Sequence, residues 1–188
     1  MHPRIPRQSA REQSGLPPVR PDDDVRLSAE LTAVVSGARR RALRDGDRQI
    51  DTAHLLHSLL DADVEAYGVL DTEPHLPRLL GYLVQRSIGY GLRWQGTVED
   101  SGAVPVMTPA DGFSPLAARA MEYAGARAAH RADGPARGID LLAAILVDPE
   151  SRAVEVLTRA GIDARAVFAR IDERLPGGLW GGPPRSSR

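Results

Sequence analysis

Cysteine and lysine are both absent from this chain of 188 residues. The lack of cysteine excludes disulfides, thiolate metal ligands and cysteine nucleophiles. The lack of lysine excludes a lysine Schiff base and the Gly-x-x-x-x-Gly-Lys-Ser/Thr loop that binds nucleotide phosphates. The chain therefore cannot be an ATPase of the phosphate-loop class, and its 24 basic residues are all arginine.

Aromatic residues, net charge and long apolar runs are also scarce. With aromatics at 4%, a core has to be built from Leu, Val, Ile and Ala, which favours closely packed helices. The net charge of −1 gives no broad electrostatic footprint for nucleic acid. No apolar run approaches the ~20 residues of a membrane span, and residues 1–20 lack the apolar stretch of a signal peptide. We therefore expect a cytoplasmic protein without nucleic-acid or membrane partners.

Composition divides the chain into two tails and a body. Residues 1–24 are rich in proline and end in three aspartates, and residues 176–188 are rich in glycine and proline. Both are expected to be disordered or flexible tails. Between them we expect one domain over residues 25–175, with helical repeats at 27–87 and 113–175.

Residues 88–112 join the two repeats and break the helical pattern. They are rich in glycine, and they fit either a long loop or a small hairpin. Trp94 in this linker is either an anchor for a partner or a cover for the seam between the repeats.

Apolar residues at helical spacing, preceded by good capping residues, predict helices in both repeats. Ser28 is a suitable N-cap for a first helix over residues 28–44. The same reasoning predicts a helix that begins near residue 51 or 52, and further helices at 64–70, 74–87, 114–131, 139–147, 149–160 and 163–175. Gly161 is expected to end the helix before it, and Asp163 to cap the next.

The two helical blocks repeat one pattern at a shift of 86 residues, which carries Ser28 onto Ser114. Apolar and turn positions coincide under this shift, including Ala38 with Ala124, Asp47 with Asp133, and Leu55-Leu56 with Leu141-Leu142. Each block is small for a stable core. We therefore predict an all-α fold in which two four-helix repeats pack on one another with pseudo-twofold symmetry.

Five short motifs carry a resemblance to a known family. They are Leu27-Ser28, Phe113-Ser114-Pro115, Thr52-Ala53-His54-Leu55-Leu56, Gly138-Ile139-Asp140-Leu141-Leu142 and Gly161-Ile162-Asp163. Together they resemble the Clp N-terminal domain, the double repeat that precedes the ATPase rings of bacterial Clp unfoldases. In that family each repeat opens with an aromatic residue and Thr or Ser, and a Thr-Glu-His-Leu-Leu segment begins the second helix.

This resemblance covers residues 27–175 apart from 88–112, and the chain looks like a stand-alone member without ATPase modules. It implies a non-catalytic module that acts as an adaptor or regulator of a Clp machine. The implied partners are a Clp ATPase or peptidase, or its substrates and adaptors. The alternatives are a homologue that sequesters small peptide-like ligands of the unfoldase N-domain, and an uncharacterised enzyme.

In some family members, the Glu of the Thr-Glu-His segment helps to hold phosphorylated arginine. The matching positions here are Ala53 and Ile139. Because methyl groups cannot pair with a guanidinium, we expect phosphoarginine recognition to be lost or much altered. The replacement of a carboxylate by an apolar side chain at both positions favours a more apolar ligand or a protein interface. The predicted partner-binding residues are Thr52, Ala53, His54, Gly138, Ile139, Asp140 and Trp94.

Some other residues could form a metal site or an active site, but we interpret them as structural. His54 and His57 lie three residues apart on a predicted helix with Asp51 and Asp61 nearby, a spacing that metal sites use. His54 matches a family position where histidine is structural, and His57 is expected on the surface. We therefore predict no metal and no cofactor. The chain also lacks the Gly-x-Ser-x-Gly motif of hydrolases, and we predict no enzymatic activity.

Overall fold

The computed structural model describes residues 26–71, 74–87, 99, 112–131 and 134–174. The predicted tails, Trp94 and all of the predicted linker except Glu99 and Gly112 lie outside the described residues.

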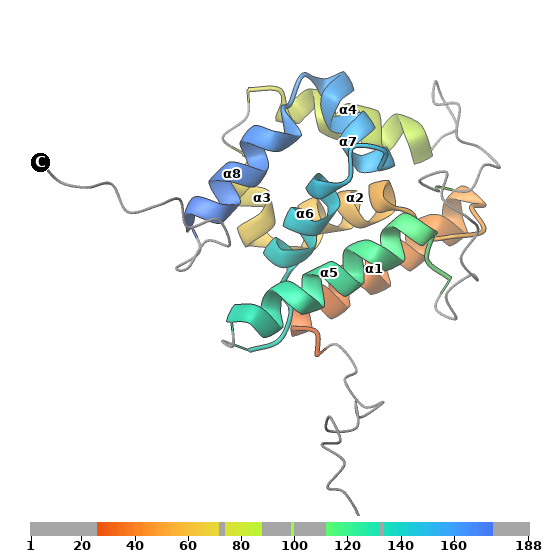
Figure 1. Cartoon of the computed structure of the whole chain (residues 1–188). Coiled ribbons are helices and arrows are strands. Elements are labelled where there is room, and N and C mark those ends of the chain that lie inside the picture. Colours follow the sequence, from red (N-terminus) through yellow and green to blue (C-terminus); the bar gives the residue numbers. More distant parts are fainter. Residues whose placement is uncertain (1–25, 72–73, 88–98, 100–111, 132–133, 175–188) are drawn as a thin grey trace, which may run out of the picture.

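The described residues form eight α-helices and contain no β-strand (Figure 1). In chain order they are α1 (Ala29–Asp45), α2 (Thr52–Ala62), α3 (Val64–Leu70), α4 (Leu76–Ser87), α5 (Pro115–Arg131), α6 (Gly138–Val147), α7 (Arg152–Ala160) and α8 (Ala164–Arg174). The all-α prediction is thus confirmed.

Local capping explains where these helices begin and end. Ser28 accepts a hydrogen bond from the Leu31 N–H at 3.1 Å and so caps α1. Gly46, in the left-handed region at φ 74°, ends α1. The predicted start of α7 at Pro149 is wrong, because Ser151 accepts a hydrogen bond from the Val154 N–H and caps the helix there.

Two isolated bridges join the beginning of each helical repeat to the other repeat. Leu27 pairs with Ala136, and Ile50 pairs with Phe113. The 86-residue shift carries Leu27 onto Phe113 and Ile50 onto Ala136, so the two bridges occupy equivalent positions. Such an exchange of equivalent partners is what a twofold rotation between duplicated units would produce.

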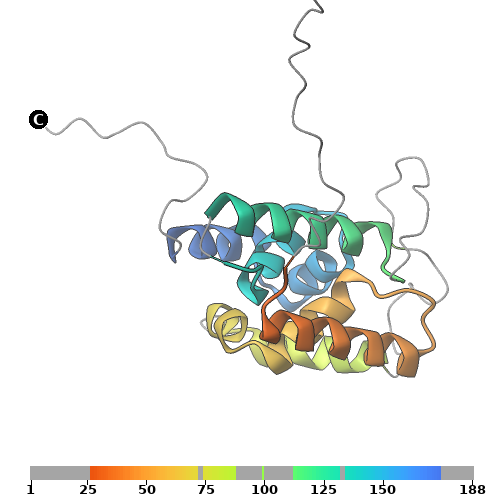
Figure 2. The ribbon, with the colours of Figure 1, turned by 90° about the horizontal axis from the view of Figure 1, so that it is seen from below.

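Helices α2 and α6 lie at the centre of the described part. Figure 2 shows α1 and α5 on opposite sides, with α2 and α6 between them, and α1 packs on α2 as α5 packs on α6. Residues 52–60 of α2 and 138–146 of α6 are all buried. Helices that are buried on every face belong to a core rather than to a surface. Among the described residues, no helix is both long enough and apolar enough to cross a bilayer.

Gly161 forms the turn between α7 and α8, and its replacement gives a first prediction. Its φ is 89°, and an added Cβ would lie 2.6 Å from the Cδ2 atom of His75. We expect Gly161→Ala to lower the free energy of unfolding by roughly 1–3 kcal/mol, from the left-handed backbone and the clash together. Urea unfolding followed by circular dichroism measures this change.

The control is Gly81→Ala in the interior of α4. An added Cβ there meets no described atom within 4 Å, and Ala is favoured over Gly inside a helix by roughly 0.5–1 kcal/mol. The control should therefore be neutral or stabilising. A Gly161→Ala variant as stable as the wild type would contradict the interpretation of this turn.

Candidate peptide-binding groove

Six of the seven predicted binding residues lie in the first turns of two central helices. Thr52, Ala53 and His54 begin α2, and Gly138, Ile139 and Asp140 begin α6. All six are buried. Their burial leaves a partner almost no surface to contact in this conformation. Their role in binding stays a prediction.

Ala53 and Ile139 require a correction. They were expected to present apolar surface to a ligand or to a protein partner, but both are no more than 2% exposed. The reason is the central position of α2 and α6, each of which contacts helices of both repeats. The expected loss of phosphoarginine recognition stays a prediction.

Glu99, a described residue of the linker, lies where the starts of three helices meet. Its carboxylate accepts hydrogen bonds from the Thr52 N–H at 2.9 Å, the Ser114 hydroxyl at 2.7 Å and the Arg152 N–H at 2.7 Å. It also accepts one from the Thr52 hydroxyl. Thr52 and Arg152 are the first residues of α2 and α7, and Ser114 precedes α5. An anion is favoured at helix starts, since free N–H groups and helix dipoles point there.

No pattern in the sequence singled out Glu99. Its partners are 47, 15 and 53 residues away along the chain, and no helical or strand spacing connects them. The only signal was indirect, because Thr52 and Ser114 are polar residues at helix starts. We call Glu99 and its four donors the linker cradle.

A second buried cluster surrounds Asp140, which is fully buried. Its carboxylate accepts hydrogen bonds from an Arg131 guanidinium N–H and, at 2.9 Å, from the Arg137 N–H. Arg127 Nε lies 3.7 Å from the same carboxylate, and another Arg127 nitrogen donates to Asp172 at 2.6 Å. Buried charges of opposite sign thus compensate one another inside the second repeat.

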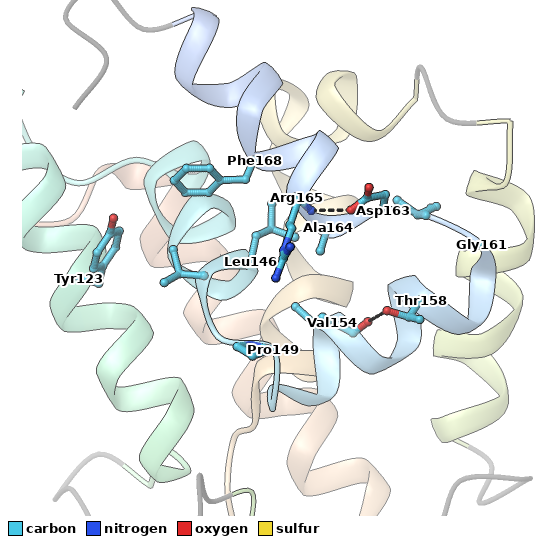
Figure 3. A pocket seen from close by; sticks show the side chains of 12 residues that line it. Tyr123, Leu146, Pro149, Val154, Thr158, Gly161, Asp163, Ala164, Arg165 and Phe168 are labelled. Atoms are coloured by element: carbon cyan, nitrogen blue, oxygen red, sulfur yellow. Dashed lines mark hydrogen bonds between the residues drawn. The ribbon is translucent and has the colours of Figure 1, made fainter. Parts of the chain in front are cut away.

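One accessible feature is an apolar groove in the second repeat (Figure 3). Its volume is about 750 Å³, and α5, α6, α7 and α8 each contribute to it. The lining residues are Tyr123, Leu146, Val147, Pro149, Val154, Thr158, Gly161, Ile162, Asp163, Ala164, Arg165 and Phe168. Pockets of this size with mostly apolar walls are typical of sites that bind ligands or peptides.

Packing behind the groove holds its aromatic wall. The Arg127 guanidinium lies over the Phe168 ring, 5.8 Å from its centroid, so the buried arginine of the Asp140 cluster also supports Phe168. At the rim, Asp163 accepts a hydrogen bond from the Arg165 N–H at 2.9 Å, and Figure 3 shows the Arg165 side chain extending into the groove. The sequence predicts helices for these residues but does not reveal which helix faces remain uncovered.

Comparison with known proteins agrees with this architecture. No protein-family model and no curated protein sequence matches the chain. The structure is similar to the crystal structure of the N-terminal domain of the caseinolytic protease associated chaperone ClpD from Arabidopsis thaliana. The TM-score is 0.58 at 21% sequence identity, and the match covers 81% of this chain and 96% of that chain. The chain therefore has the fold of a Clp N-terminal domain.

Proposed function

We propose that this chain is a non-catalytic binding module that acts as an adaptor or regulator of a Clp-type unfoldase or its peptidase. The observation that carries the proposal is the apolar groove between α5, α6, α7 and α8. Two further points support it: the fold is that of the ClpD N-terminal domain, and the sequence contains neither lysine nor cysteine for covalent catalysis.

The proposed occupant of the groove is a short apolar peptide segment of the partner, with an acidic residue beside it. The walls are largely apolar, with Leu146, Val154 and Phe168 contributed by three different helices. Arg165 is exposed at the rim, where its guanidinium can pair with a carboxylate. Apolar burial would supply affinity, and the rim charge would set the direction of the bound segment.

A second candidate function is sequestration of small peptide-like ligands of the unfoldase N-domain. The groove volume of about 750 Å³ favours it, because pockets of roughly 300–1,000 Å³ hold drug-sized ligands. The two functions differ in what must bind: a Clp subunit or substrate in the first, and a free cyclic or short peptide in the second.

A matched pair of valines tests whether the groove binds partners. Val147 lines the groove and is 50% exposed, whereas Val84 on α4 is 54% exposed and does not line it. We expect Val147→Glu to weaken binding by roughly tenfold or more, because a carboxylate would lose hydration against an apolar ligand. Val84→Glu should leave binding unchanged.

Fluorescence anisotropy with purified Clp ATPase, Clp peptidase and a permanently unfolded model substrate measures these affinities. Association with a Clp component that Val147→Glu alone weakens supports the adaptor function. Binding of a cyclic peptide without any Clp association supports sequestration instead. The groove proposal is wrong if both variants bind as tightly as the wild type.

A further inference from the structure

The outer face of α1 carries a group of arginines around an exposed leucine. Arg39, Arg40 and Arg44 are exposed on the helix, and Arg48 is exposed in the turn that follows it. Leu43 is 74% exposed. It lies one helical turn after Arg39 and Arg40, because residues three and four apart share a face of a helix. We call these four arginines and Leu43 the basic patch.

The acidic residues next to the patch are turned toward the interior. The Asp45 side chain is only 6% exposed, and its Oδ2 atom lies 3.6 Å from Nε2 of the buried His54. Asp47 Oδ2 lies 3.3 Å from the same nitrogen. The surface that a partner would meet is therefore formed by the arginines more than by these carboxylates.

Two arginines of the patch have no counterion in the part of the chain that the structure describes. Arg44 Nε lies 3.3 Å from Asp45 Oδ1, so this charge is partly compensated. Arg40 and Arg48 make no ion pair with a described residue. The exposed acid Glu30 lies ten residues before Arg40, which is about 15 Å along the helix. The patch therefore keeps positive charge on its outer side.

The fold itself does not require these side chains. The 86-residue shift carries Arg40 onto Ala126 and Leu43 onto Ala129. The equivalent helix α5 packs on α6 as α1 packs on α2, although it has small side chains at these positions. Attraction to the negative end of a helix dipole is confined to the last turn. It therefore accounts for Arg44 but not for Arg40.

A small depression of about 190 Å³ lies within the patch. Its lining includes the apolar Leu43 and Ile50, the basic Arg39 and Arg48, and Asp47. A depression of this size has room for one apolar side chain, and guanidiniums beside it pair well with carboxylates. Nucleic acid fits less well, because proteins that bind single strands stack the bases on aromatic side chains, and none of the five patch residues is aromatic.

We propose that the basic patch binds an acidic peptide segment of a partner protein, which inserts one apolar side chain beside Leu43. Carboxylates next to that side chain pair with Arg40 and Arg48. The patch belongs to α1 and the turn after it, whereas the groove lies between helices of the second repeat. Figure 2 shows α1 and α5 on opposite sides of the described part. The inference therefore does not depend on the proposed function, and a chain that uses both surfaces would hold two segments at once.

The test measures fluorescence anisotropy of a short labelled peptide, in which one leucine is flanked on both sides by aspartates and glutamates, with the full chain. Binding should saturate and weaken as salt is added, because exposed charges are screened. Arg40→Gln/Arg48→Gln should weaken binding roughly fivefold or more, since two exposed ion pairs are lost. Leu43→Ser should also weaken it, by roughly threefold or more. A peptide with serine in place of its leucine should not distinguish Leu43→Ser from the wild type.

Matched controls remove the same charge and the same kind of apolar surface elsewhere. Arg26→Gln/Arg174→Gln lowers the net charge by the same amount at two exposed positions outside the patch. Val64→Ser removes an apolar side chain that is even more exposed than Leu43. Both control variants should bind the peptide like the wild type, and so should Val147→Glu in the groove. All the exchanged side chains are exposed, so circular dichroism should show unchanged folding.

Four results would overturn the proposal. The first is the absence of saturable binding up to about 1 mM peptide. The second is equal weakening by the two double arginine variants, which would show that only net charge matters. The third is loss of binding in Val147→Glu, which would place the peptide in the groove. The fourth is tighter binding of a thymidine oligonucleotide of the same charge, which would assign the patch to nucleic acid.

Discussion

Replacing Glu99 with alanine should lower the free energy of unfolding by about 3–5 kcal/mol. The linker cradle would lose its only carboxylate, and four buried donors would lose their acceptor. Two of these donors are backbone N–H groups in the first turns of α2 and α7, which no neighbouring carbonyl of the same helix can satisfy. Urea unfolding at neutral pH measures the loss.

Two further variants distinguish the loss of the linker cradle from the general effect of removing an acidic side chain. Glu122 is exposed on α5, so Glu122→Ala should change stability by no more than roughly 0.5 kcal/mol. Glu99→Gln keeps one acceptor oxygen but turns an amide N–H₂ toward donors, and its loss should be intermediate. If Glu99→Ala costs no more than Glu122→Ala, the carboxylate does not hold the helix starts together.

The cradle gives the linker a structural role that its glycine content did not suggest. A single acidic side chain contacts α2 of the first repeat and α7 of the second. Ala153 N–H also donates to the Thr52 hydroxyl at 3.1 Å, and Arg152 pairs with Asp51. The two repeats therefore meet through polar groups at helix starts as well as through apolar packing.

The helices were predictable because their signals are local. Ser28 caps α1 through a residue three positions away, and the boundaries of α3 agree with those predicted from sequence. A duplicated pattern of apolar spacing and turns indicated two four-helix repeats, and the resemblance of five short motifs implied the Clp N-terminal domain fold, which the ClpD structure supports. Errors arose where two signals competed: Pro149 suits a helix start, but Ser151 provides the cap.

The sites were harder to predict because they depend on contacts between segments far apart in sequence. Spacing along α2 suggested that His57, Asp51 and Asp61 would accompany His54. Asp51 does lie beside it, but the carboxylates near His54 Nε2 belong to Asp45, the last residue of α1, and to Asp47 in the turn that follows. His57 is buried rather than on the surface as predicted. Likewise, the residues matched to the family motif proved to be buried, since sequence spacing does not reveal which repeat covers which helix. The groove was equally hard to predict, because it consists of helix faces that other helices leave uncovered.

Removing the Asp140 carboxylate should be as damaging as removing that of Glu99. In Asp140→Ala, the guanidiniums of Arg131 and Arg127 would remain buried without their shared anion. Breaking one partner of a buried charge cluster costs about 3–5 kcal/mol, and we expect a loss in that range by urea unfolding. The exposed pair of Asp148 with Arg119 provides the control, since Asp148→Ala should cost no more than about 1 kcal/mol.

A second substitution at the same position distinguishes a structural role for Asp140 from the predicted binding role. Asp140 holds Arg131 directly, and Arg127 in turn lies over Phe168 in the groove wall. The conservative Asp140→Asn, which keeps an acceptor oxygen, should recover part of the stability and leave partner affinity close to that of the wild type. An Asp140→Asn chain that is fully folded but no longer binds a Clp partner would show that the carboxylate contacts the ligand, and the buried cluster would then have to open on binding.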